Sequence, residues 1–100
     1  MKHLLCNYYL DCRYDSRSSF YNKARVKYFN DETQILSSYD TQVAVIKDGK
    51  AYINGTYSQT TVRHIKEFLK QNNFKAETSK QMCKDYLVSD SEFNNLIRGY

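Results

Sequence analysis

Apolar and polar side chains alternate along much of the first half of the chain, which is the period of a half-buried β-strand. The alternation predicts two strands, over residues 3–11 and around 24–28, and a third strand over 34–38, around Ile35 and Leu36, follows the turn signal at residues 30–32. In the second strand, Ala24 and Val26 alternate with Arg25 and Lys27, so the charged side chains should point away from the core. Residues 15–22 carry three serines and little periodicity, which predicts a loop or one helical turn.

A hairpin over residues 41–57 is the clearest local signal. Asp48-Gly49 separates two apolar β-runs, and a type I′ turn requires positive φ at both of its central positions. This turn fixes the register of the hairpin. The expected cross-strand pairs are Lys47–Lys50, Val45–Tyr52, Thr41–Thr56 and Asp40–Tyr57.

The spacing of apolar residues changes to that of a helix after the hairpin. N-cap residues gather at 58–61, and apolar side chains at helical spacing follow, which predicts a helix from about Thr61 to Gln71. Its predicted apolar arc contains Val62, Ile65, Phe68 and Leu69. The residues expected to face water are Arg63, Lys66, Glu67 and Lys70, and His64 falls at the edge of the arc.

Two further short helices are predicted near the end of the chain. Thr78 and Ser79 can begin the first, and Ser89-Asp90-Ser91-Glu92 has the capping-box spacing that begins the second. We therefore expect one α+β domain over 1–100, with an antiparallel sheet of four to five strands, one helix packed on a face and two short C-terminal helices. The expected core residues are Val43, Val45, Ile53, Ile65, Phe68 and Leu69, with Ala44 and Ile46 able to share it.

Composition restricts the class of protein. Hydrophobic residues make up 41% of the 100 residues, enough for a modest core, and ten of the fifteen aromatics are Tyr. Three cysteines do not form the even set of a secreted disulfide scaffold, so we expect a cytoplasmic protein. No apolar stretch approaches the length of a membrane span.

The net charge of +4 is confined to one segment. Residues 13–27 contain five basic residues against Asp15 alone, while the rest of the chain carries ten of each sign. The predicted partner-binding residues are Arg13, Arg17, Tyr21, Arg25 and Lys27. A nucleic acid or an acidic protein surface would suit them, and a solvated loop and strand face remains an equal alternative.

Zinc is the first metal to consider, because the chain supplies enough ligand types for it. The candidate ligands are His3, Cys6, Cys12 and Cys83, together with His64. In one continuous strand, Cys6 and Cys12 would lie about 20 Å apart, too far to share an ion. We therefore expect no metal and favour the cysteines as small buried apolar residues.

The sequence carries no pattern typical of an enzyme. It has no glycine-rich phosphate loop, no Gly-x-Ser-x-Gly and no carboxylate pair at a telling spacing. Nothing in it brings His64 to a cysteine, as nucleophilic catalysis would require. We expect no catalysis, no cofactor and no small-molecule substrate.

A polar cluster is expected where the open end of the hairpin meets the predicted helix. Its members are Asp40, Thr41, Tyr57, Thr60, Arg63 and His64. A helix N-terminus can hold an anion. The favoured alternative is structural, with Asp40 itself as that anion, capping the helix or pairing with Arg63.

Two motifs in the chain resemble a known family. Residues 36–44, with Ser38-Tyr39-Asp40-Thr41, and residues 57–72, with Tyr57-Ser58-Gln59-Thr60-Thr61-Val62-Arg63-His64-Ile65, are similar to a widespread family of small proteins from phages and Gram-positive bacteria. That family is of unknown function. The resemblance covers roughly Ala24 to Phe74, and the segments on either side of it are not explained by it.

The resemblance implies a class of function by analogy. Small phage proteins without catalytic motifs resemble inhibitors of host defence, of which anti-CRISPR proteins are the best-known class. The expected partner is then a type II CRISPR effector nuclease or its guide-RNA complex, blocked by stoichiometric binding in the cytoplasm of the bacterial host cell. The chain is basic, which disfavours DNA mimicry. The alternative is a phage accessory protein that binds nucleic acid on a basic, tyrosine-rich sheet face.

Overall fold

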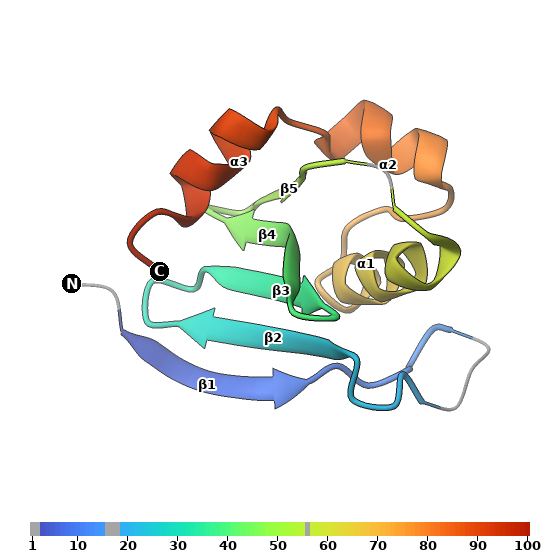
Figure 1. Cartoon of the computed structure of the whole chain (residues 1–100), viewed down its shortest axis with the longest axis horizontal. Coiled ribbons are helices and arrows are strands. Elements are labelled where there is room, and N and C mark those ends of the chain that lie inside the picture. Colours follow the sequence, from blue (N-terminus) through green and yellow to red (C-terminus); the bar gives the residue numbers. More distant parts are fainter. Residues whose placement is uncertain (1–2, 16–18, 56) are drawn as a thin grey trace.

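The computed structural model describes residues 3–15, 19–55 and 57–100. Five strands are followed by three helices, which confirms the predicted α+β class (Figure 1). The elements are β1 (Leu4–Tyr9), β2 (Ala24–Phe29), β3 (Gln34–Ser38), β4 (Thr41–Lys47), β5 (Lys50–Ile53), α1 (Gln59–Gln71), α2 (Ser79–Tyr86) and α3 (Asp90–Ile97).

The sheet is an antiparallel meander in which spatial order follows chain order, β1-β2-β3-β4-β5. Asp48 and Gly49 have φ of 54° and 75°, as a type I′ turn requires. The predicted pairs Lys47–Lys50 and Val45–Tyr52 are present in the β4–β5 ladder. That ladder ends at Ala44–Ile53, and Ile53 then bridges to Leu87 instead of continuing along β4.

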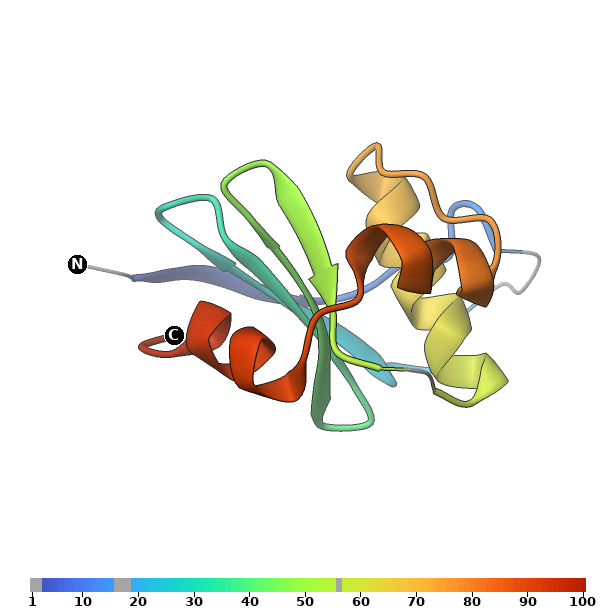
Figure 2. The same cartoon turned by 90° about the horizontal axis from the view of Figure 1, so that it is seen from above.

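Helices cover both faces of the sheet (Figure 2). On one face, α1 and α2 close a core with side chains from β2 to β5, including Val26, Leu36, Ile65 and Phe68. On the other face, Phe93 of α3 closes a second core, whose sheet members are Phe29, Ile35 and Val45. The six expected core residues are all buried, but Val45 belongs to the second core and the other five belong to the first.

A β-bulge in β4 explains why neighbouring residues share one core. The β3–β4 register shifts between Leu36 and Ser37, so that Val43 has no cross-strand partner of its own. Val43 and Ala44 therefore both pack in the α1 core, which strict alternation would not allow.

Each helix begins at the residue type expected of an N-cap. Ser58, Thr78 and Ser89 accept hydrogen bonds from the backbone N–H groups of Thr61, Gln81 and Glu92 respectively. The predicted start of α1 is therefore two residues late, and the predicted starts of α2 and α3 are confirmed. At the end of α1, Asn72 is the C-cap and Asn73 follows in the left-handed region, with φ of 67°.

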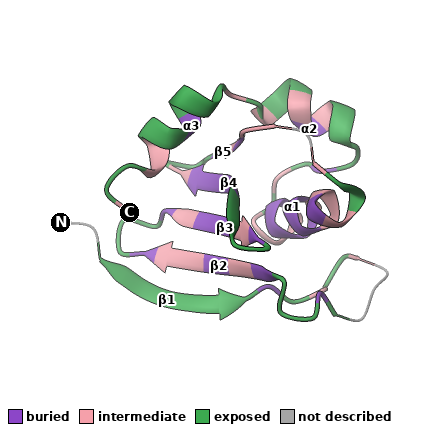
Figure 3. Ribbon diagram, in the orientation of Figure 1, coloured by how far each residue is buried: buried purple, intermediate pink, exposed green. Residues whose placement is uncertain are grey.

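The prediction of a half-buried first strand is wrong. β1 is exposed along its whole length (Figure 3), and burial resumes only at Leu10. β1 is the edge strand next to β2, whereas α1 contacts β3, α2 contacts β5 and α3 contacts β4. Alternation identified the strand, but it could not indicate that none of the three helices packs over it.

Candidate functional site

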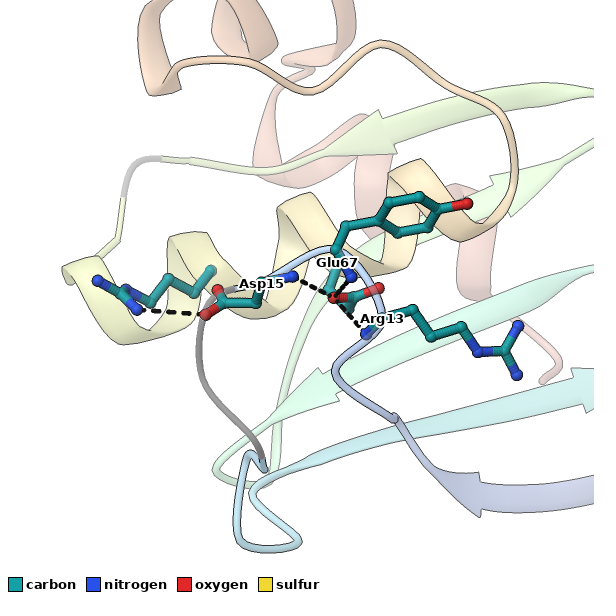
Figure 4. A network of polar contacts seen from close by, with 5 residues as sticks. Arg13, Asp15 and Glu67 are labelled. Atoms are coloured by element: carbon teal, nitrogen blue, oxygen red, sulfur yellow. Dashed lines mark hydrogen bonds and ion pairs between the residues drawn. The ribbon is translucent and has the colours of Figure 1, made fainter.

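The loop that follows β1 is held against α1 by a carboxylate. Oε1 of Glu67 accepts hydrogen bonds from the backbone N–H groups of Arg13, Tyr14 and Asp15, at 2.9, 2.8 and 3.0 Å (Figure 4). Its other oxygen accepts from the Gln71 amide at 2.7 Å. Successive backbone N–H groups of this kind form a concave anion site, which the chain fills with its own side chain.

The expectation that Glu67 faces water is therefore wrong. Its side chain is 1% exposed, because residues 13–15 fold over the helix and cover it. Helical periodicity places a residue on a face, but it cannot show that a distant loop covers that face. In the close view, the side chain of Arg13 extends away from the hydrogen-bonded carboxylate (Figure 4).

Arg63 also contacts this loop. Its guanidinium lies 3.3 Å from the carboxylate of Asp15. Both residues, with Tyr14, Lys66 and Lys70, line a cavity of about 240 Å³ beside α1. The predicted pairing of Arg63 with Asp40 is therefore not formed.

Asp40 pairs with the sheet instead of the helix. It lies 2.5 Å from the Arg25 guanidinium, and the two side chains are 86% and 42% exposed. The N-cap of α1 is Ser58, so Asp40 does not cap it. The reason is the early end of the β4–β5 ladder: Tyr39-Asp40 forms the β3–β4 turn and does not face Tyr57 across the hairpin.

A buried polar network joins β3 to the first turns of α1. The Ser38 hydroxyl lies 2.7 Å from Nδ1 of His64 and 3.1 Å from the Thr61 hydroxyl, and all three residues are buried. Burial lowers the pKa of the His64 imidazole below its ordinary value, and the charge of Asp15 opposes that shift. The two sequence motifs therefore meet in space, at the buried side chain of His64.

Two tight turns lie next to each other beside this network. Their central residues are Tyr21-Asn22 and Tyr39-Asp40, with φ of 52°, 62°, 51° and 69°. The N–H of Tyr39 donates to the carbonyl of Lys23 at 2.9 Å and so links one turn to the other. Bulky aromatic residues rarely adopt this left-handed conformation.

These turns and the start of α1 form what we call the aromatic pocket, a cavity of about 280 Å³. His64 packs edge-on against Phe20, with ring centroids 4.6 Å apart, and lies 5.8 Å from the ring of Tyr39. Phe20 is buried, while Tyr21 and Tyr39 are 73% and 52% exposed. The residues that line the pocket are Ser19, Phe20, Tyr21, Lys23, Tyr39, Thr60, Arg63 and His64.

The sheet face on the α3 side is open to solvent at the end distant from the second core. Cross-strand partners share a face, so Tyr9, Arg25, Ser37 and Gln42 form one row across four strands. Asn7 and Lys27 form the next pair, and Lys27 is followed by the buried Ile35. All six are exposed or half-buried, and we call them the outer basic face: Asn7, Tyr9, Arg25, Lys27, Ser37 and Gln42.

The predicted partner-binding residues do not form one patch. Arg25 and Lys27 lie on the outer basic face, Tyr21 in the aromatic pocket, and Arg13 on the loop beside α1. Arg17 and Thr56 lie outside the described residues. The alternation that turned Arg25 and Lys27 away from the α1 core is confirmed.

The predicted hairpin-mouth cluster is brought together only in part. Thr60, Arg63 and His64 share the aromatic pocket, whereas Thr41 is exposed and the Tyr57 hydroxyl donates to Asn54. Sequence reasoning missed Tyr39 and Phe20 as members. A signal was present, since Tyr-Asn and Tyr-Asp pairs precede strands and Asn and Asp favour turns.

The low-priority zinc ligands do not form a site in the part of the chain that the structure describes. There, no group of three or more His, Cys, Asp or Glu side chains is placed to hold a metal ion. The expectation that the cysteines are buried is wrong for Cys6, which is exposed on β1, while Cys12 and Cys83 are half-buried against the α1 core. No disulfide joins these three residues.

Comparison with known proteins shows a family match over most of the chain. The sequence model of DUF8033, a family of unknown function, matches residues 8–86. No curated protein and no solved structure was found to match the chain. None of the helices in the described ranges is long and apolar enough to cross a membrane.

Proposed function

Because the chain belongs to DUF8033, a family of unknown function, we propose its function from its geometry: it binds single-stranded nucleic acid on the outer basic face. One observation carries this proposal. Tyr9 lies directly across from Arg25 on a sheet face that the described helices α1, α2 and α3 leave uncovered at this end. An exposed aromatic ring next to a cation offers stacking to a base and charge to its phosphate.

The other members of the face suit the same ligand. Lys27 supplies a second cation, and the amides of Asn7 and Gln42 supply donors and acceptors to base edges or sugars. The protein works by binding in the host cytoplasm, without catalysis or a cofactor. Binding of this kind reads the charge and the stacking surface of a strand more than its sequence.

Charge removal on this face is the first prediction. In Arg25→Gln/Lys27→Gln, affinity for a fluorescent single-stranded oligonucleotide should fall, measured by anisotropy over a salt series. Each lost phosphate contact on a single strand makes the negative slope of log K against log salt shallower by about 0.7, so the slope for the double variant should be shallower by about 1.4. The matched control is Lys80→Gln/Lys84→Gln, which removes two exposed charges from α2.

Removal of the Asp40–Arg25 ion pair should change the affinity for the oligonucleotide in the opposite direction. Asp40→Asn frees the Arg25 guanidinium, so it should raise the affinity for the oligonucleotide by up to about fivefold, which corresponds to the free energy of one exposed ion pair. An Asp40→Asn variant that binds more weakly than the unaltered protein, or a control that loses as much as Arg25→Gln/Lys27→Gln, would contradict the assignment of this face.

The second candidate is the anti-CRISPR type of inhibitor, which would bind a type II CRISPR effector nuclease or its guide-RNA complex. The observation in its favour is the number of exposed tyrosines, the residue type that dominates protein interfaces: Tyr8, Tyr9, Tyr14, Tyr21 and Tyr39. A nuclease cleavage assay and a pull-down with and without nuclease treatment separate the candidates. Capture that survives nuclease treatment and high salt, together with inhibited cleavage, would replace the nucleic-acid proposal with the inhibitor.

A further inference from the structure

We propose that the aromatic pocket binds a nucleobase that carries a phosphate. Two exposed tyrosine rings, Tyr21 and Tyr39, stand at its rim over a floor formed by Phe20 and His64. A planar heterocycle stacks favourably on such rings, whatever the base. The volume of about 280 Å³ lies just below the roughly 300 Å³ at which pockets for drug-sized ligands begin, so it suits a single base.

The charges around the pocket select an anionic ligand. Lys23 and Arg63 are the charged residues among the described residues that line it, and the nearby Asp15 and Asp40 are paired with Arg63 and Arg25 respectively. Lys23 is exposed and forms no ion pair with any of the described residues. Arg63 contacts Asp15 through one nitrogen, and a guanidinium has further N–H donors for a phosphate oxygen. Cationic ligands, which aromatic rings can also hold, are disfavoured by these two side chains.

The backbone supports a role for the two tyrosines beyond packing. Both occupy the first central position of a turn with positive φ, where Gly, Asn or Asp would be less strained. Tyr21 gains little burial in return, since it is 73% exposed. Strained residues of this kind gather at ligand-binding sites, where the strain positions a side chain for use.

The pocket lies on the α1 side of the sheet, and the Tyr39-Asp40 turn connects it to the outer basic face on the α3 side. Tyr39 lines the pocket and Asp40 pairs with Arg25, so a strand that passes around this turn would bring a base to the pocket. In this respect the inference rests on the proposed function. The base and phosphate could belong to such a strand or to a free nucleotide, and the two experiments below separate these sources.

The first experiment titrates the isotope-labelled full-length protein with adenosine 5′-monophosphate and follows amide chemical shifts. The expected result is saturable shifts at Tyr21, Lys23, Tyr39 and Arg63. Ribose 5-phosphate, which lacks the base, should bind at least about fivefold more weakly, because stacking contributes about 1 to 3 kcal/mol per base. Equal affinity for ribose 5-phosphate, or shifts confined to other parts of the protein, would overturn the proposal.

The second experiment tests the rings. Tyr21→Leu and Tyr39→Leu should each weaken adenosine 5′-monophosphate binding by at least about fivefold. The matched control is Tyr14→Leu, which removes an exposed tyrosine outside the pocket and should bind as the unaltered protein does. Tyr39→Asn is the second variant, because Asn adopts the left-handed backbone readily and preserves the turn. Unchanged affinity in both Tyr39 variants would overturn the inference.

The oligonucleotide measurements distinguish this inference from the proposed function. Adenosine 5′-monophosphate binding that survives Arg25→Gln/Lys27→Gln, while no oligonucleotide binds the unaltered protein, would identify a free-nucleotide site and remove the proposed function alone. Oligonucleotide binding that is unaffected by Tyr21→Leu and Tyr39→Leu would keep the proposed function and remove the pocket as the site of a bound base.

Discussion

Glu67 determines where the loop after β1 lies, because three consecutive N–H groups converge on one of its oxygens. The loop begins the basic segment, so this buried carboxylate fixes how Arg13 is presented to solvent. A negative side chain thus organises the region in which the positive charge of the chain is concentrated.

Truncation of Glu67 tests this role. Glu67→Ala removes the acceptor of the three amides, so the free energy of unfolding should fall by about 1 to 3 kcal/mol. Amide hydrogen exchange at Arg13, Tyr14 and Asp15 should accelerate in the same variant. Lys66→Ala, at the neighbouring helix position, should leave both quantities nearly unchanged, and protected amides in Glu67→Ala would contradict the role.

His64 makes stability depend on pH. Its folded-state pKa is lowered by burial, so between that value and the unfolded value of about 6.5 the unfolded chain binds a proton that the folded chain does not. Stability from this group is therefore complete above about pH 6.5 and declines as the pH falls toward the lowered pKa.

Urea unfolding from about pH 7.5 to about pH 5 measures this effect. His64→Gln keeps a side-chain group that can hydrogen-bond with Ser38 and should remove the His64 part of the decline, although its stability at neutral pH will be lower. His3→Gln should retain the decline. An acid decline of the same size in His64→Gln would show that other groups cause it.

At the scale of elements, two variants distinguish the predicted cap of α1, Asp40, from the observed N-cap, Ser58. Ser58→Ala should lower the free energy of unfolding by about 0.5 to 2 kcal/mol, the value of a lost N-cap. Asp40→Asn should change it by at most about 1 kcal/mol, since it removes only an exposed ion pair and Asn tolerates positive φ. Thermal or urea unfolding of both variants compares the two, and a larger loss in Asp40→Asn would restore Asp40 as the cap.

Most elements were predictable because their signals are local. The Asp48-Gly49 turn sets the β4–β5 register through its own backbone requirement, and Ser58, Thr78 and Ser89 cap helices through atoms three residues away. The point where β5 leaves β4 was not predictable. It depends on a contact between Ile53 and Leu87, which local patterns do not encode.

At the scale of the whole molecule, the sheet is buried from both sides by helices that follow it in the chain. Val43 and Val45 are two residues apart, so alternation alone places both on the same face of the sheet. The bulge in β4 instead puts Val43 in the first core and Val45 in the second, and both faces are apolar there. The candidate site was predictable only in part for the same reason. Arg63 and His64 were expected close together, and they are. The acidic partners of Arg63 and Arg25 were not predictable, because they depend on where distant loops lie in the fold.

The meander has a consequence for how the chain folds during synthesis. Each strand pairs with the one made just before it, so the sheet can form as the nascent chain emerges, through contacts of short sequence separation. Phe93 is made after every strand, and until α3 leaves the ribosome the apolar side chains of Phe29, Ile35 and Val45 have no cover. The closing of this face by α3 must therefore follow the synthesis of all five strands, and before it the nascent protein is open to association with other chains.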